Sequence, residues 1–215
     1  MFKGKVLLFS LLLVFATSVY AGDVDPCQSD FGISCVGMRV SICPAGDFEF
    51  IYDACGTGAD YIEVWVRDNS GNGIQNIPFS DYWLNACDPA QELCLCSAPF
   101  GASALTDENG YTTIIGRIAG GGCILTGGIY LAVQGKPLVD YPGCVDVTCE
   151  AVQIVSPDLN ADCAVNLSDL GVFGLSYNKI QGGAGYNACC DLNDDAKCNL
   201  SDFAFMGEHY QHVCF

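Results

Sequence analysis

Basic residues and histidines are scarce in this sequence, and each shortage excludes a class of function. The 215 residues include eight Lys and Arg against 25 Asp and Glu, which gives a formal net charge of −17 at pH 7. Nucleic acids and anionic membranes both bind basic surfaces, so neither is expected as a partner. The only histidines are His209 and His212, near the C-terminus. Because no nucleophile, base and orienting group can be named together, we expect a protein without catalytic activity.

Cys-x-x-Cys pairs are also absent, so the sequence lacks the ligand set of a zinc finger or ribbon. Cysteine itself is abundant, with fifteen copies that all follow the N-terminal leader. In that leader, Lys3 and Lys5 precede an apolar run over 6–15 that is too short to span a bilayer comfortably. The pattern predicts a secretory signal over 1–21, cleaved after Ala21. We therefore expect a secreted, extracellular or cell-surface protein with a disulfide framework.

Residues 22–155 have the pattern of β structure. In the segment 61–67, Ile62, Val64 and Val66 alternate with the residues of the opposite strand face. Further strand candidates are 48–52, 111–115, 129–133 and a segment within 145–155. Short strands separated by Gly-rich turns predict a disulfide-rich antiparallel β-sandwich over 22–155.

Two segments of this region are expected to be irregular. Residues 81–103 lack a strand period and are interpreted as a long loop held by Cys87, Cys94 and Cys96. Residues 119–123 are interpreted as a glycine-rich turn stapled by its own cysteine. The region's ten cysteines allow five internal bridges, whose pairing the sequence leaves open.

The strand and turn of residues 62–74, together with the turn and strand of 106–112, resemble bacterial immunoglobulin-like and transthyretin-like sandwich modules of secreted surface proteins. This resemblance implies an immunoglobulin-like form of the sandwich.

After a boundary near 155–157, a twelve-residue pattern occurs twice, thirty-three residues apart. Oxygen-bearing side chains stand at positions 1, 3, 5, 9 and 12 of both copies, the spacing with which a tight loop wraps a hard cation. They are Asp158, Asn160, Asp162, Asn166 and Asp169 in the first copy, and Asp191, Asn193, Asp195, Asn199 and Asp202 in the second. The sequence therefore predicts two Ca²⁺ sites.

Each loop is followed by apolar residues at the spacing i, i+3, i+7 of a short amphipathic helix. These stripes are Leu170, Phe173 and Tyr177 in the first copy, and Phe203, Met206 and Tyr210 in the second. We expect the two helices to bury their stripes against each other.

The duplicated pattern Asp-x-Asn-x-Asp-x-x-hydrophobic-Asn-x-x-Asp-hydrophobic, within residues 157–212, resembles a dockerin domain. In that family each half is an EF-hand-like calcium loop followed by one helix, and the loop ends in Asp, as at Asp169 and Asp202. The resemblance implies a dockerin-like module over 156–215. It also implies a cohesin module as the partner, which would tether the protein to a scaffold or cell surface.

The resemblance also implies roles for other loop residues. The main-chain carbonyls of Ala164 and Lys197 would be ligands, with Asn166 and Asn199 acting through water. Loop positions 10 and 11 often contact the partner in this family, and here they are Leu167, Ser168, Leu200 and Ser201. Because both halves present the same pair, a partner could bind in two orientations. The alternative is that the leucines cover the neighbouring domain.

Position 6 departs from the usual loop pattern. It is normally Gly because the chain turns there with positive φ, but here it is Cys163 and Ala196. A side chain at such a position costs on the order of 1–2 kcal/mol, which lowers calcium affinity unless disulfides offset it. Five cysteines in this module suggest a bridge between Cys163 and the pair 189–190. One cysteine is then left to bridge to the sandwich, stay free or join another molecule.

These features favour a non-catalytic structural or assembly protein whose calcium-stabilised module docks to a partner or a neighbouring subunit. The alternative is a carbohydrate-binding accessory protein of a cellulosome-like system, with exposed aromatic side chains as platforms for polysaccharide. Candidate platforms are Trp65, Tyr82 and Trp83. A small secreted glycan hydrolase with paired carboxylates is a third hypothesis. His209, His212 and Cys214 could hold a metal, but a solvated helix end is expected.

Overall fold

The computed structural model describes residues 22–34, 39–45, 61–96, 101–115, 118–138 and 149–214. The expected signal over 1–21 and strand over 48–52 lie outside these residues, as does the beginning of the 145–155 segment. In the portions described, no helix combines the length and apolar character that a bilayer crossing needs.

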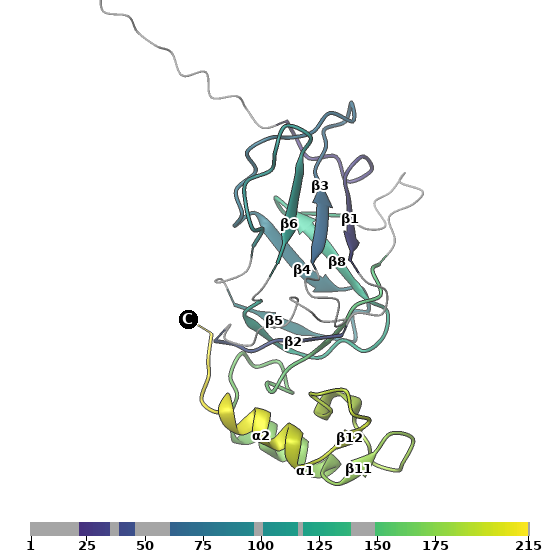
Figure 1. Cartoon of the computed structure of the whole chain (residues 1–215), viewed down its shortest axis with the longest axis vertical. Coiled ribbons are helices and arrows are strands. Elements are labelled where there is room, and N and C mark those ends of the chain that lie inside the picture. Colours follow the sequence, from purple (N-terminus) through teal and green to yellow (C-terminus); the bar gives the residue numbers. More distant parts are fainter. Residues whose placement is uncertain are drawn as a thin grey trace, which may run out of the picture.

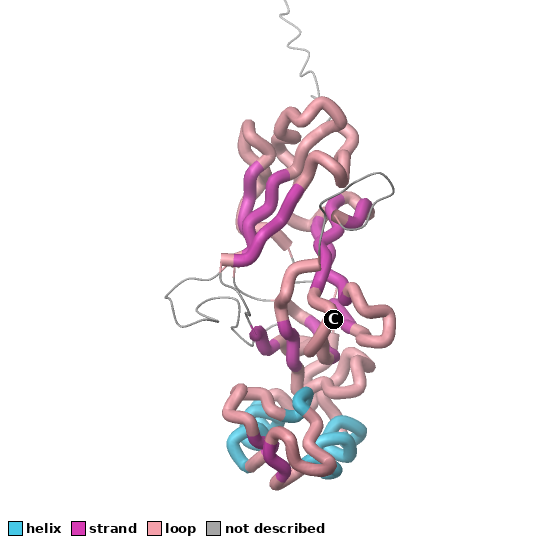
Figure 2. The backbone as a smooth tube through the Cα atoms, turned by 90° about the vertical axis from the view of Figure 1, so that its right-hand side faces the viewer, coloured by secondary structure: helices cyan, strands magenta, loops and turns pink. Residues whose placement is uncertain are grey.

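A β-rich part and a small helical module make up the described chain (Figure 1). The strands of the β-rich part are β1 (Asp30–Ile33), β2 (Arg39–Ser41), β3 (Ile62–Trp65), β4 (Tyr82–Ala86), β5 (Leu93–Leu95), β6 (Tyr111–Ile114), β7 (Gly120–Gly122), β8 (Ile129–Val133), β9 (Lys136–Pro137) and β10 (Gln153–Val155). The module contains α1 (Leu167–Ser176), β11 (Lys179–Ile180), the 3-10 turn η1 (Ala188–Cys190), β12 (Lys197–Cys198) and α2 (Leu200–Glu208). Figure 2 shows both helices at one end of the molecule. The observed class is mainly β, with two helices among the described residues.

Two three-stranded antiparallel sheets form the frame of the β-rich part. In one, β3 lies between β1 and β6; in the other, β8 lies between β4 and β9. The alternation predicted for 61–67 is confirmed, because Ile62, Val64 and Val66 are buried while Trp65 is partly exposed.

Both sheets contribute to one hydrophobic cluster. Val64 and Ile114 enter it from the first sheet, and Leu84 and Leu131 from the second. This arrangement is consistent with the predicted β-sandwich-like fold. The immunoglobulin-like form remains a prediction.

Two smaller strand pairs lie between this frame and the module. β5 pairs with β7 in the antiparallel sense, but β2 and β10 run parallel. The expectation of a purely antiparallel arrangement is therefore wrong for β10, which runs beside β2 immediately before the module begins. This pairing places the module against β2.

Both segments expected to be irregular contain strands, so these two interpretations are wrong. Within 81–103, β4 has Tyr82, Leu84 and Ala86 buried and Trp83 exposed, an alternation that the Cys- and Pro-rich stretch after it obscured. The glycines of β7 form a buried strand because neighbouring backbone lies very close. A Cβ on Gly120 would lie 2.6 Å from the Cys94 carbonyl oxygen.

The apolar stripes of the two helices are only partly buried. Phe173 and Met206 belong to a second hydrophobic cluster, but Tyr177, Phe203 and Tyr210 are exposed. Phe173 and Phe203 contact each other across the two helices, with ring centroids 5.8 Å apart, but the expected burial is wrong for three of the six stripe residues, one in the first stripe and two in the second. The reason is that side chains from the chain between the helices fill this cluster in their place.

Three disulfides join the module to the β-rich part. They are Cys94–Cys163, Cys96–Cys214 and Cys123–Cys189, with Cα–Cα separations of 5.5, 5.2 and 5.8 Å. The expected bridge between Cys163 and the 189–190 pair is wrong, because Cys163 and Cys189 each bond to the β-rich part and Cys190 forms no disulfide. Five internal bridges within 22–155 are excluded for the same reason.

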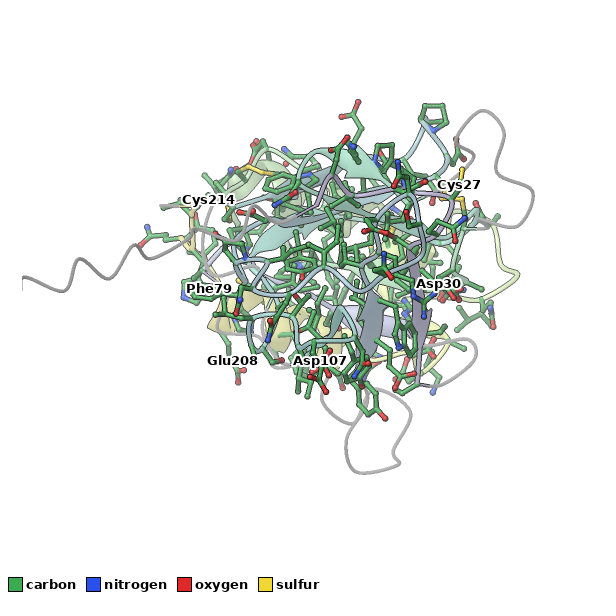
Figure 3. The ribbon with its side chains drawn as sticks, turned by 90° about the horizontal axis from the view of Figure 1, so that it is seen from above. Cys27, Asp30, Phe79, Asp107, Glu208 and Cys214 are labelled. Atoms are coloured by element: carbon green, nitrogen blue, oxygen red, sulfur yellow. A yellow bond between two sulfur atoms is a disulfide. The ribbon has the colours of Figure 1, made fainter. Side chains whose placement is uncertain are left out.

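Several other cysteines form no bridge across this junction. Cys87–Cys149 lies within the β-rich part, and Cys190 and Cys198 are free and buried. Cys27 is also disulfide-bonded, and Figure 3 places it on the opposite side of the molecule from Cys214.

Candidate metal centres

The first loop gathers the carboxylates of Asp158, Asp162 and Asp169, with one oxygen of each within 4.8 Å of the others. Asp158 and Asp169 are fully buried. Asn160 Oδ1 accepts a hydrogen bond from the Asp162 N–H at 3.1 Å, and Asn166 Nδ2 lies 3.3 Å from Asp162 Oδ2. The structure therefore brings together the five side chains that the spacing singled out.

The second loop repeats this arrangement. Asp191, Asp195 and Asp202 also place one oxygen each within 4.8 Å of the others, and the first and last are buried. Asn193 Oδ1 accepts from the Asp195 N–H at 3.2 Å, and Asn199 Nδ2 donates to Asp195 Oδ2 at 3.0 Å. Two loops with the same internal contacts indicate one structural unit used twice.

The last carboxylate of each loop closes it. Asp169 Oδ1 accepts from the N–H groups of Leu159 and Asn160 at 2.8 and 3.2 Å. Its Oδ2 accepts from the Asn166 N–H at 2.8 Å. Asp202 makes the corresponding three contacts in the second loop. Main-chain N–H donors therefore hold the position-12 carboxylate of each loop in place independently of a bound cation.

Each loop also starts its helix. Asn166 and Asn199 are the N-caps, and their Oδ1 atoms accept from the N–H groups of Ser168 and Ser201 at 2.8 and 2.7 Å. Each forms a capping box with the Asp three residues later. Their water-mediated contact with calcium remains a prediction, as do the carbonyl ligands of Ala164 and Lys197.

The conformation predicted at position 6 is present in both loops. Cys163 has φ 68° and Ala196 has φ 65°, which is the left-handed region that favours glycine. Cys163 is held in this conformation by its disulfide to Cys94, while Ala196 has no such bridge. The strain expected from the sequence therefore exists at both sites, and a covalent link supports it at one.

The buried carboxylates need positive charge. Burial, and then repulsion from Asp169, raises the pKa of Asp158 to about 7, and burial raises the pKa of Asp202. A divalent cation between these groups would supply the compensating charge. An all-oxygen set of carboxylate and amide groups is the kind that hard Ca²⁺ prefers, so the residues present fit this ion.

Gly121 was not recognised from the sequence as part of a site. It lies on β7 against the first loop, where a Cβ would overlap the Asp158 carboxylate, and the neighbouring Gly122 N–H donates to the Asp158 carbonyl at 2.8 Å. The run of three glycines at 120–122 could have indicated this close approach, because neighbouring atoms leave no room for a side chain at any of the three positions. The first loop is thus built against the β-rich part.

We expect Gly121→Ala to weaken calcium binding at the first loop by about tenfold or more, because a displaced Asp158 costs on the order of 1–3 kcal/mol. The second loop should keep its affinity. Isothermal titration calorimetry would resolve the two sites. Gly32→Ala is the matched control, since a Cβ there meets nothing within 4 Å; equal losses at both loops would contradict the assignment.

An arginine from the β-rich part anchors the second loop. Arg39, on β2, lies 2.6 Å from Asp194 Oδ1 and donates to the carbonyls of Ala188, at 3.0 Å, and Asp191. Tyr186 donates its hydroxyl to Asp191 Oδ2 at 2.7 Å. Asp194 is not at a ligand position, so Arg39 positions the loop without replacing the cation.

The four residues predicted to bind a partner lie on the surface. Leu167 is 72% exposed and Leu200 67% exposed, and Ser168 and Ser201 are exposed beside them. In this structure neither leucine covers the β-rich part. Of the four, Leu200 lines an apolar groove of about 400 Å³, together with Leu170, Phe173, Gly174, Tyr177 and Phe203.

The histidines are not a solvated helix end, so this expectation is wrong for His209. His209 is 8% exposed and its ring packs edge-on against that of His212, with ring centroids 5.2 Å apart. Cys214 bonds to Cys96 and is not available to join them as a ligand.

The aromatic candidates for sugar binding are separated by the fold. Tyr82 is buried at 2% exposure, so it cannot act as a platform. Trp65 packs against Tyr111, with ring centroids 5.5 Å apart. Trp83 alone of the three is substantially exposed.

Comparisons with known proteins add little to this geometry. No family model matches the chain, and no curated protein matches it. The solved structures that are similar to it include two interface mutants of a type II cohesin–X–dockerin complex from Acetivibrio cellulolyticus. One, the C-terminal interface mutant, is 18% identical over 81% of this chain and 94% of that chain, with a TM-score of 0.28. The N-terminal interface mutant is 18% identical over 82% and 94%, with a TM-score of 0.29. An overlap this low assigns neither a fold nor a function.

Proposed function

We propose that this protein is a secreted, non-catalytic assembly component whose dockerin-like module, rigidified by two Ca²⁺ ions, docks to a protein partner. The observation that carries the proposal is the repeated loop and helix with the same exposed leucine at position 10 of each loop. Such surface leucines lose apolar contact with water when a partner covers them. The partner is a cohesin-like module or a neighbouring copy of the chain in an extracellular assembly.

Calcium links the loops to this surface. Each helix begins directly at the loop, with its N-cap asparagine and its position-12 aspartate in the same capping box. Ordering the carboxylates therefore orders the first turn of the helix, which carries Leu167 or Leu200. A calcium-free loop, with buried carboxylates left uncompensated, would present these leucines less rigidly.

The disulfides support the extracellular location. Bridges such as Cys87–Cys149 and the three at the junction persist in oxidising compartments. The three junction bridges also hold the module against the β-rich part, so that force on a docked partner passes through covalent links. This is the mechanical property that a fibre or matrix component needs.

Sedimentation velocity in millimolar calcium and in chelator would test the proposal. The protein is measured alone over a range of concentrations and mixed with a purified type II cohesin module. We expect a calcium-dependent complex in one of these arms, lost when the ion is removed. A monomer under every condition, alone and with the module, would contradict docking. An assay for glycan hydrolysis is expected to show no turnover.

We expect the double change Leu167→Asp and Leu200→Asp to lower the affinity for the partner by about 100-fold or more. A leucine buried at an interface contributes about 1.5–3 kcal/mol, and each 1.4 kcal/mol is a factor of ten. Leu175→Asp is the matched control, because Leu175 is 80% exposed on α1 but lies outside loop positions 10 and 11, which the proposal assigns to the partner. The same sedimentation assay measures both variants, and equal losses would argue against this surface.

Carbohydrate binding is the second candidate function, and the exposure of Trp83 favours it. Trp83 lies on β4, facing away from the buried Tyr82 and Leu84. A pull-down with insoluble polysaccharides would show binding that Trp83→Ala removes. Retention that is unaffected by this change would leave docking as the better explanation.

A further inference from the structure

Three side chains with metal-binding atoms meet where the end of the chain returns to the β-rich part. Cys43 Sγ lies 3.3 Å from His212 Nδ1, and His209 Nδ1 lies 3.3 Å from the same His212 atom. One ligand atom of each residue lies within 4.8 Å of the other two. Cys43 and His209 are buried, and His212 is partly exposed.

Local structure fixes both histidines. His209 is the C-cap of α2 and donates its N–H to the Phe205 carbonyl at 3.3 Å. The chain then turns through Gln211, at φ 71°, and the His212 N–H donates to the His209 carbonyl at 3.1 Å. The His212 carbonyl accepts from the Val165 N–H at 2.8 Å. The two imidazoles therefore face each other because of main-chain geometry.

Cys43 comes from the other part of the molecule. Its carbonyl accepts from the Gly120 N–H at 3.0 Å, which fixes it against β7. The Cys96–Cys214 disulfide lies next to the cluster, because Cys214 follows His212 by two residues and Cys96 Sγ contacts the Pro44 carbonyl at 3.0 Å. Figure 1 shows the chain after α2 running back toward β5 and β2. The cluster is thus preorganised by a covalent bond beside it.

The distances fit a tetrahedral ion. Ligands about 2.0–2.1 Å from a tetrahedral zinc ion are separated from one another by about 3.3–3.4 Å, and a thiolate at about 2.3 Å lies slightly farther from them. The nitrogen–nitrogen and sulfur–nitrogen separations at His212 are of this size. Moreover, an imidazole nitrogen has either one hydrogen or one lone pair in its plane, so His212 Nδ1 cannot form two good hydrogen bonds at once. A cation between the three atoms could take one ligand from each residue.

We propose that Cys43, His209 and His212 form a site for a zinc-like divalent transition metal, with the fourth position open to water beside His212. Imidazole and thiolate ligands suit borderline metals, whereas the loop sites offer oxygen alone. The ion would join the end of α2 to the β-rich part. The site uses none of the side chains assigned above to calcium or to docking, although the His212 backbone is hydrogen-bonded to Val165 of the first loop.

Cobalt(II) titration of the disulfide-intact protein, in excess calcium and without reductant, would test this proposal. Excess calcium keeps cobalt out of the oxygen-ligand loops. We expect one equivalent of cobalt with the visible bands of a four-coordinate ion and a thiolate-to-metal charge-transfer band. Cys43→Ser should remove the charge-transfer band, and His209→Ala or His212→Ala should weaken binding by about tenfold or more. Zinc should displace the cobalt.

The matched control is Cys190→Ser, which removes a buried thiol outside the cluster and should leave the spectrum unchanged. Mapping of alkylation on the wild-type protein gives a second readout that needs no variant. Bound zinc should protect Cys43 against alkylation and leave Cys190 and Cys198 as reactive as before. The proposal is overturned if the wild-type protein shows no thiolate band. It is also overturned if zinc does not slow the alkylation of Cys43 in urea below the unfolding transition, at a concentration where this buried thiol reacts without zinc.

Discussion

Asp169→Asn is expected to remove calcium binding at the first loop and the stabilisation that depends on it. At free calcium about 1,000 times Kd, one site adds about 4 kcal/mol to the free energy of unfolding. Asparagine lacks the charge that the ion needs. In addition, Asp169 now accepts hydrogen bonds from the N–H groups of Leu159, Asn160 and Asn166. The NH2 group of an asparagine would face one or more of these donors with another donor. Hydrogen bonds to a carboxylate of this kind contribute about 1.5–3 kcal/mol each.

The measurement is urea unfolding of the wild type and the variant, each in saturating calcium and in chelator. The difference between the two conditions isolates the contribution of calcium from that of the hydrogen bonds. We expect this difference to fall by the amount due to one site, while the second loop still binds. Glu208→Gln, which removes an exposed charge at the end of α2, is the control and should keep the full difference. An undiminished calcium effect in Asp169→Asn would show that this loop is not a calcium site.

Removing the Cys123–Cys189 bridge is expected to lower the free energy of unfolding by about 4 kcal/mol. The bridge closes a loop with a sequence separation of 66 residues, and the chain-entropy model assigns about this value to such a loop. The variant is Cys123→Ser with Cys189→Ser. Cys189 belongs to η1, immediately before the second calcium loop. The loss should therefore fall on the module, which would separate from the β-rich part more readily.

A bridge of similar length provides the comparison. Cys87–Cys149, with a separation of 62 residues, lies within the β-rich part, so its removal should cost about as much without loosening the module. Hydrogen exchange distinguishes the two double variants. Faster exchange in α1 and α2 is expected when Cys123–Cys189 is absent, and faster exchange in β4 and β8 when Cys87–Cys149 is absent. Identical exchange patterns would show that the junction bridge does not hold the module in place.

The features that could be predicted from the sequence are those that depend on residues close together along the chain. The positions of the loop aspartates and asparagines depend on contacts within twelve residues, which is why both clusters formed as the spacing predicted. The positive φ at Cys163 and Ala196 follows from the same local turn. The alternation in β3 likewise reports burial on one face of a single strand.

Contacts between distant segments were not accessible in this way. The glycines of 120–122 look like a turn because nothing in their own sequence shows that β5 and Asp158 approach them closely. The cysteine count allowed many pairings, and three bridges to the module exist because β5 and β7 lie next to it. The burial of His209 beside Cys43 depends on the same approach.

By itself, the sequence determined that two oxygen-lined loops precede two short helices, because those features depend on neighbours a few residues apart. Tertiary structure alone decided that the module is bonded to the β-rich part through three disulfides and Arg39. It also decided that Leu167 and Leu200 face solvent and that a cysteine meets two histidines. The physical reason is that such contacts join residues separated by 66 to 169 positions, and only the packed chain brings them within reach.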